Sequence, residues 1–130
     1  MRVPILKQGD YLIASIQPVF ADQDLLQLHD DLAAQVGKYR SKGVIVDVTA
    51  LDAMDSFATR TLRDLAQSVR LRGAETVIVG IQPEVAFAMV QLGLEFGTVQ
   101  TALDLEEGLA LLGVLAQPPQ AADEVQEWRP

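Results

Sequence analysis

The chain has 130 residues, of which 49% are hydrophobic and 22% are charged, a length and composition that fit one soluble globular domain. Eighteen acidic residues against ten basic ones give a net charge of −8, which argues against nucleic acid or an anionic membrane as the main partner and favours a basic protein surface. The absence of cysteine excludes disulfides and thiolate chemistry, and a single histidine excludes a multi-histidine metal site.

The first predicted element is a β-hairpin. Residues 3–6 and 11–16 are short apolar runs, which is typical of strands. The linker between them, KQGD at residues 7–10, is rich in turn residues and contains Gly9, which can adopt a positive φ. We therefore expect the two runs to pair as antiparallel strands.

A helix is predicted to follow the hairpin from Asp22 onward. Its apolar side chains recur three or four positions apart, which places them on one helical face. They are Leu25, Leu28, Leu32 and Val36. Glycine is the commonest residue just past a helix end, so we expect Gly37 or Gly43 to end this helix.

Two β-branched runs, residues 44–46 and 76–79, predict strands covered on both faces, because neither alternates with polar residues. Between them, apolar residues recur at helical spacing over residues 58–69, and Gly73 follows as a stop. A helix that joins two strands in this way forms a right-handed crossover, so we expect the two strands to be parallel neighbours.

The last third of the domain predicts two more helices and one strand. Pro83 suits the first turn of a helix and Gly93 suits its C-terminal cap. A weaker strand near residues 99–102 leads to DLEE at residues 104–107, whose two carboxylates can cap a final helix. The side chains predicted to face inward on these helices are Val85, Met89 and Leu92, then Leu105, Leu109 and Leu112.

The predicted order is therefore ββαβαβαβα, an α/β fold with a mixed, mostly parallel sheet whose antiparallel member, from the N-terminal hairpin, lies at or near an edge. Composition changes only near the C-terminus, where residues 117–123 lack an apolar period and Trp128 stands alone among polar residues. We expect one domain over residues 1–115 and a disordered tail over residues 116–130. Trp128 either docks on a partner or lies loosely on the surface, and the sequence leaves both possibilities open.

The segment DVTALDAMDS at residues 47–56 follows a predicted parallel strand, at the sheet edge where ligands and chemistry gather. Asp55 and Ser56 are both preferred N-cap residues, so either one can begin the next helix. Ser56 can also be a phosphate acceptor at an exposed junction. A phosphate there would gain from the helix dipole but would add roughly −1.5 to −2 charges beside Asp52 and Asp55, which would work against an acidic or close-packed interface.

The stretch GVIVDVTALDAMDSF at residues 43–57 resembles the signature of STAS domains in the anti-sigma-factor antagonist family. A second stretch, ETVIVGIQPEVA at residues 75–86 followed by VQLG at residues 90–93, is similar to the stressosome antagonist subgroup of that family. The resemblance runs from the hairpin to Leu112. It implies a STAS fold and a non-catalytic regulator in which Ser56 is phosphorylated by a partner serine kinase of the histidine-kinase-like ATPase superfamily.

The resemblance also implies how such a protein acts: unphosphorylated, it sequesters the kinase in a stressosome-like complex, and phosphorylation releases the kinase. Related co-antagonists carry an N-terminal sensory domain and a second phosphorylatable threonine where this chain has Val79. The chain thus resembles the antagonist without a sensor, which assembles with sensor-bearing STAS paralogues. Apolar residues off the inward face of the Pro83 helix also predict an oligomer, with itself or with paralogues; they are Phe87, Val90 and Leu94.

Side chains near Ser56 predict where a partner binds. We expect Asp55, Phe57, Arg60 and Arg63 to contact the kinase, and Met54 to add apolar surface to the same patch. Phe57 has an alternative role in the core, because aromatic side chains are more often buried than exposed.

Other functions find less support in the sequence. A receiver-like domain phosphorylated on Asp47 would need further acids for Mg²⁺ and a lysine after a later strand, and both are missing. Neither phosphate-loop nor dinucleotide motifs occur, and His29 is remote from Ser56, so we expect no enzyme, cofactor or metal site. A purely structural STAS scaffold whose Ser56 is never modified stays open. No signal peptide and no apolar run near the roughly 18 residues that span a membrane are found, so we expect a cytoplasmic protein.

Overall fold

The computed structural model describes residues 2–115, which form five strands and four helices. In chain order these are β1 (Ile5–Gln8), β2 (Tyr11–Ser15), α1 (Asp22–Tyr39), β3 (Gly43–Asp47), α2 (Ser56–Arg70), β4 (Glu75–Val79), α3 (Pro83–Gln91), β5 (Gln100–Ala102) and α4 (Leu105–Leu115). The predicted order ββαβαβαβα is confirmed. The tail predicted for residues 116–130, with Trp128, lies outside the described residues.

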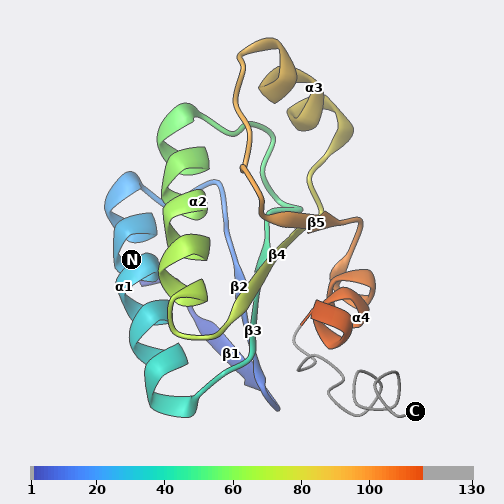
Figure 1. The fold of residues 1–130 in the computed structure, drawn as a ribbon. Coiled ribbons are helices and arrows are strands. Elements are labelled where there is room, and N and C mark those ends of the chain that lie inside the picture. The colour runs from blue at the N-terminus through green and yellow to red at the C-terminus, as the bar shows by residue number, and fades with distance from the viewer. Residues whose placement is uncertain (1, 116–130) are drawn as a thin grey trace, which may run out of the picture.

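The strands form one sheet in the order β1-β2-β3-β4-β5 (Figure 1). β1 pairs with β2 in antiparallel register and lies at the edge, while all other neighbours are parallel. Gly9 makes the tight hairpin turn with φ +59°, so the hairpin prediction is confirmed, although β1 continues to Gln8. β3 and β4 are the expected parallel neighbours.

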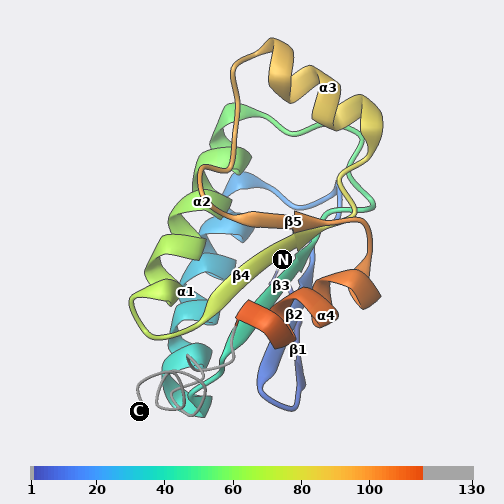
Figure 2. The same cartoon turned by 45° about the vertical axis from the view of Figure 1, so that its right-hand side comes forward.

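The helices cover both faces of this sheet. α1 and α2 lie side by side on one face and α4 lies on the other, as Figures 1 and 2 show. Alternate residues of β3 therefore enter different cores: Val44 and Val46 pack with α1 and α2, whereas Ile45 packs with Leu112 of α4. This two-sided burial explains why the central strands are continuous β-branched runs.

The predicted end of α1 is wrong. The helix continues through Gly37 to Tyr39, and Arg40 adopts the left-handed conformation of the cap with φ 52°, its N–H donating to Val36 O. Gly43 instead begins β3, where an added Cβ would lie 2.8 Å from the Leu112 side chain. Gly43 thus serves the close approach of β3 to α4 and not the helix end.

The predicted limits of α3 are confirmed, with Pro83 at its first turn and Gly93 at φ +70° just past its end. Two residues predicted to face inward do not. Leu92 is 70% exposed because the helix stops at Gln91, and Leu105 is exposed because α4 only begins there. At the first residue of a helix, or beyond its last one, the helical period alone does not determine which side a residue faces.

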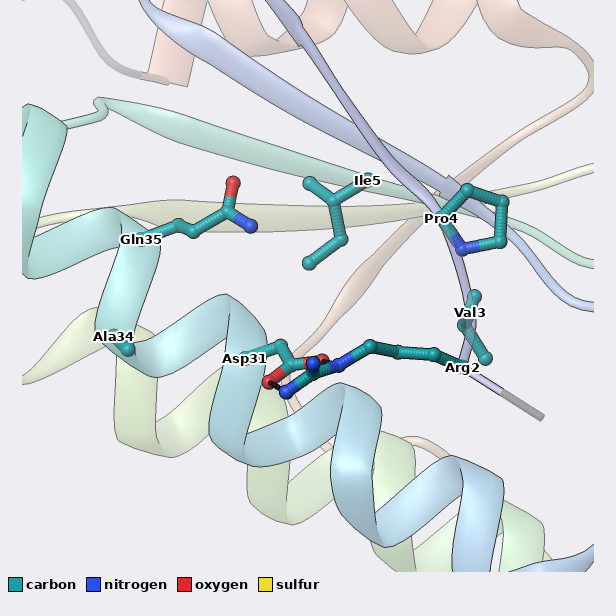
Figure 3. Close-up of a pocket in the computed structure, with 7 residues that line it drawn as sticks. All are labelled: Arg2, Val3, Pro4, Ile5, Asp31, Ala34 and Gln35. Carbon is teal, nitrogen blue, oxygen red and sulfur yellow. Dashed lines mark hydrogen bonds and ion pairs between the residues drawn. The ribbon is translucent and has the colours of Figure 1, made fainter.

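The segment before β1 is held against α1 by an ion pair. Arg2 Nε donates to Asp31 Oδ2 at 2.9 Å and Arg2 Nη2 donates to Oδ1 at 3.1 Å, and Figure 3 shows the two side chains meeting between the elements. They line a cavity of about 460 Å³ together with Ile5 and Gln35. The contact fixes the start of the edge strand β1 on the first helix.

Candidate functional site

Three loops meet at the edge of the sheet where the parallel strands end. β2 ends at Ser15, β3 at Asp47 and β4 at Val79, and the next helices start from the loops that follow. α3 stands beyond this edge, near the start of α2, in both Figure 1 and Figure 2. The edge therefore gathers the segment at residues 47–56 and the second stretch singled out in the sequence.

Hydrogen bonds fix the shape of the loop after β3. The Asp47 carboxylate accepts from the Thr49 N–H at 2.9 Å and from the Thr49 hydroxyl. Gln82 Nε2 donates to Thr49 O at 2.7 Å and so ties this loop to the start of α3. Gly80 has φ +81°, and a Cβ added there would overlap the Thr49 hydroxyl, so only glycine allows this contact.

Sequence reasoning missed the link between Thr49 and Gln82. The available signal was the stretch GIQP at residues 80–83, in which the sequence pointed to Pro83 as a helix start but not to a contact of Gly80 or Gln82. Its glycine permits the close approach, its glutamine supplies the hydrogen bond and Pro83 begins α3. Asp47 serves as the anchor of this loop, and residues 2–115 contain no cluster of three or more His, Asp or Glu side chains that could hold a metal.

Asp55 is the N-cap of α2. Its Oδ1 accepts a hydrogen bond from the Ala58 N–H at 2.7 Å, and its backbone O accepts from the Thr59 hydroxyl at 2.9 Å. Ser56 is the first residue of the helix, is exposed, and its hydroxyl has no hydrogen-bond partner within residues 2–115. The alternative that the sequence left open is thus decided: Asp55 caps, and the Ser56 hydroxyl has no structural task.

Basic side chains follow Ser56 along one strip of α2. The spacing of four, three, four and three positions places Ser56, Arg60, Arg63, Gln67 and Arg70 on the same side of the helix. Arg60 is exposed, whereas Arg63 is half-buried and donates from Nη1 to Glu95 O at 3.1 Å. A charge placed on Ser56 would therefore lie one helical turn before Arg60 on the same side of α2.

The remaining patch residues differ in exposure. Phe57 is half-buried, so its side chain is accessible in part. Met54 is only 6% exposed and packs in the core beneath α1 and α2, so its predicted place in an exposed patch is wrong. A thioether side chain in a loop is as readily a core gap-filler as a surface contact.

A cavity of about 320 Å³ lies beside the start of α2. Its apolar walls come from the loops after β2 and β3, which supply Phe20, Leu51 and Met54, and from the facing sides of α1 and α2. Asp52 and Asp55 also line it, so the site beside Ser56 is hollow, apolar and acidic. Sequence reasoning missed this cavity because its walls come from segments about thirty residues apart.

His29 lies away from this site. Its Nε2 is 3.1 Å from the Ser68 hydroxyl and so links α1 to α2, and the ring is half-buried. Ser68 is twelve positions after Ser56 on α2, or about 18 Å along the helix. The structure does not bring His29 to Ser56, in agreement with the boundary position expected for it.

The two stretches that carried the family resemblance meet at this one edge of the sheet. A family model described as STAS domain matches residues 7–108. The chain belongs to the STAS domain family. The family and fold predicted from the sequence are confirmed, with the N-terminal hairpin, the five-stranded sheet and the four helices in place.

Within this family the chain is similar to stressosome proteins. RsbS of Moorella thermoacetica, in a form with a serine-to-glutamate substitution, superposes with a TM-score of 0.77 at 36% identity, over 89% of this STAS chain and 98% of that one. A chain of the stressosome, described as a signal integration and transduction hub, gives a TM-score of 0.74 at 36% identity, over 88% of this chain and 100% of that one.

The RsbT co-antagonist protein RsbRA of Bacillus subtilis is 31% identical over 83 residues, which are 64% of this chain and 30% of that protein. Across the RsbR co-antagonists that it matches, the STAS chain spans a quarter to a third of their length. Between residues 2 and 115, no helix is both long and apolar enough to pass through a lipid bilayer.

Proposed function

We propose that this chain is a non-catalytic regulator that sequesters a partner serine kinase and releases it when Ser56 is phosphorylated. The observation that carries the proposal lies at the start of α2: Asp55 caps the helix, and the Ser56 hydroxyl is exposed without a partner in the described residues. The likeness to RsbS, known in a serine-to-glutamate form, and to co-antagonists of RsbT supports it.

The charges around Ser56 give the switch its mechanism. A phosphate adds roughly −1.5 to −2 charges, which the positive end of the α2 dipole and the Arg60 guanidinium favour. The carboxylates of Asp52 and Asp55 repel the phosphate, so further negative charge from a bound partner is unfavourable at this surface. Phosphorylation thus has two effects on a bound kinase: it repels acidic groups of the partner and it draws Arg60 into a contact within the chain.

The kinase-binding surface that we propose surrounds this switch. Arg60 is exposed, Phe57 is half-buried and Arg63 is held by Glu95 O at the side of the strip. Asp55 contributes to the surface although its carboxylate already caps α2. The adjacent cavity gives an apolar side chain of the kinase a place to bind beside the charged groups.

The second partner class that we propose is other STAS domains, either copies of this chain or sensor-bearing paralogues. α3 offers an exposed apolar surface for such contacts, since Phe87 is 65% and Val90 is 78% exposed. Leu94, expected to join them, is half-buried and packs against the core. We assign this STAS domain to residues 1–115, and we propose a cytoplasmic location and no cofactor.

The deciding experiment measures the affinity of the genomic-neighbour serine kinase for the unmodified, the enzymatically phosphorylated and the Ser56→Ala forms. We expect tight binding of the unmodified and Ser56→Ala forms and weak binding of the phosphorylated form. The weakening should shrink at high salt, because screening reduces the effect of the added charge. Equal affinity of the phosphorylated and unmodified forms at low salt would leave the chain as a structural STAS scaffold.

A further inference from the structure

The cavity beside the start of α2 carries negative charge without a counter-charge. Three carboxylates line it: Asp22 from the start of α1, Asp52 from the loop after β3 and Asp55 from the N-cap of α2. None of the described residues that line it is a lysine, an arginine or a histidine. Asp22 and Asp52 are exposed, and neither forms a hydrogen bond or an ion pair with any residue in the range 2–115. Both carboxylates are therefore available to a cation from outside the chain.

The inner surface of the same cavity is apolar. Leu25, Leu51 and Met54 line it and are 6%, 9% and 6% exposed, and the half-buried Phe20 joins them. Its volume of about 320 Å³ lies at the lower end of the range of about 300–1,000 Å³ that small-molecule pockets have, so it suits one or two side chains of a partner. Arginine and lysine place their methylene stems on apolar surface and keep the charged end at the rim. The cavity thus fits an occupant that combines apolar surface with a cation.

α2 separates this cavity from the basic strip. Ala58 and Leu62 line the cavity from α2. Arg60 lies two positions from each of them, which turns its side chain by about 200°, to the other side of the helix. The surface around the start of α2 is therefore negative on one side and positive on the other. A partner with the complementary arrangement of charges binds in one orientation, because any other orientation brings like charges together.

We propose that the cavity binds a segment of the partner serine kinase that carries an arginine or lysine beside a large apolar side chain. The apolar side chain enters the cavity, and the cation binds Asp22 and Asp52. This contact fixes the orientation of the kinase relative to Ser56, and it rests on the proposed function, which supplies the kinase. A phosphate on Ser56 adds negative charge and does not repel this cation, so the cavity serves docking and the release acts at the basic strip.

Neutralising the two free carboxylates tests the cation. Asp22→Asn with Asp52→Asn keeps the shape of both side chains and leaves the Asp55 cap in place. It should weaken binding of the genomic-neighbour kinase at least about tenfold at low salt, and less at high salt. The matched control Asp30→Asn with Glu106→Gln removes the same charge from exposed positions that do not line the cavity, and it should bind as the unmodified chain does. Circular dichroism checks that both variants are folded.

Filling the cavity tests the apolar part of the contact. Ala58→Leu adds apolar volume to the lining of the cavity without a change of charge, and it should weaken kinase binding at high salt as well as at low salt. Ala110→Leu is the matched control, because it adds the same volume at an exposed position of α4, and it should leave kinase binding unchanged.

Charge reversal identifies the residue of the kinase. Asp22→Lys with Asp52→Lys should abolish binding, and a kinase in which one particular lysine or arginine is replaced by glutamate should restore it. If no single replacement in the kinase restores binding, net charge explains the loss and the proposal is overturned. Equal binding of the neutralised variant and its control, or of Ala58→Leu and its control, would also overturn it.

These results are distinct from a failure of the Ser56 switch. If the cavity variants bind normally while phosphorylation still weakens binding of the unmodified chain, the docking contact is wrong and the proposed function stands. If the unmodified chain does not bind the kinase in either phosphorylation state, the proposed function and this inference are overturned together.

Discussion

The Asp55 carboxylate accepts a hydrogen bond from the Ala58 N–H at 2.7 Å, so the side chain that caps α2 is that of Asp55 and not that of Ser56, the first residue of the helix. Helix capping by Asp55 and the proposed phosphorylation of Ser56 thus fall on adjacent residues. A substitution of Asp55 should leave the Ser56 hydroxyl in place, and a substitution of Ser56 should leave the cap in place, so the two effects can be measured separately.

We predict that Asp55→Ala lowers the free energy of unfolding by about 1 kcal/mol, because the Ala58 N–H loses its acceptor. Ser56→Ala should change it by less than about 0.5 kcal/mol, since the serine hydroxyl is exposed and unpartnered within residues 2–115. Urea unfolding of the two variants measures both values. An equal loss in both would mean that Ser56 shares the capping role.

Gly80→Ala should be more disruptive than a change at another left-handed glycine. At Gly80 the added Cβ meets both an unfavourable φ of +81° and the Thr49 side chain, so we expect a loss above about 2 kcal/mol. Gly73→Ala is the matched control, because φ is +92° there but nothing lies within 4 Å of the added Cβ, and it should cost about 1 kcal/mol. Thermal and urea unfolding measure the difference. Equal losses of stability in the two variants would show that the close contact between Gly80 and Thr49 adds nothing to the cost of the positive φ.

The sequence predicted those parts of the fold that depend on local patterns. Strand and helix order followed from the apolar periods, and the helix ends at Pro83 and Gly93 followed from their backbone preferences. The end of α1 was missed because Arg40, a residue with no preference for positive φ, takes the left-handed position. The sequence also could not show whether Asp55 or Ser56 caps α2, since both residue types are good N-caps and only the backbone conformation decides between them.

For the candidate site, too, the sequence predicted the features that depend on local spacing and missed those that depend on tertiary packing. Ser56 and its strip of arginines share one helix, so their spacing alone places them together. The cavity at Leu51 and Phe20 joins residues from two loops and two helices, and its shape depends on packing between segments far apart in the chain. Such tertiary features leave no periodic trace in a single sequence.

The ion pair between Arg2 and Asp31 should make stability depend on pH. The hydrogen bond from Arg2 lowers the pKa of Asp31 below its usual value. Because the folded-state pKa is the lower one, the contribution is fully present above the unfolded-state pKa and is lost as pH falls through the folded-state pKa. We expect Asp31→Asn to lower the melting temperature slightly near neutral pH and to have no effect once the carboxyl is protonated in both states; an effect that persists in acid would contradict the role of the charge.

The exposed surface of α3 should control assembly. Phe87→Ser with Val90→Ser should shift the protein toward monomer in sedimentation experiments, alone or with a sensor-bearing paralogue, because the apolar contact is lost. Val19→Ser is the control, since Val19 is similarly exposed at 68% but lies in the loop before α1. Sedimentation as monomer by the unmodified chain in both settings would argue against the assembly role.

Arg60 and Arg63 should be needed for kinase capture. We predict that Arg60→Ala with Arg63→Ala weakens kinase binding at least about tenfold, which corresponds to about 1.4 kcal/mol. Arg60 is exposed one turn after Ser56, so its loss removes a charge from the proposed interface without disturbing the core. Circular dichroism checks that loss of the Arg63 contact with Glu95 O leaves the fold in place.

The matched control for this pair is Lys42→Ala with Arg72→Ala, which removes the same charge from exposed positions away from the strip. It should bind the kinase as the unmodified chain does, and the difference between the two double variants should shrink at high salt, because screening weakens contacts between charges. If both double variants bind equally weakly, net charge and not the strip governs the encounter. If neither loses affinity, the kinase binds elsewhere, and the position of Arg60 beside Ser56 has no part in the switch.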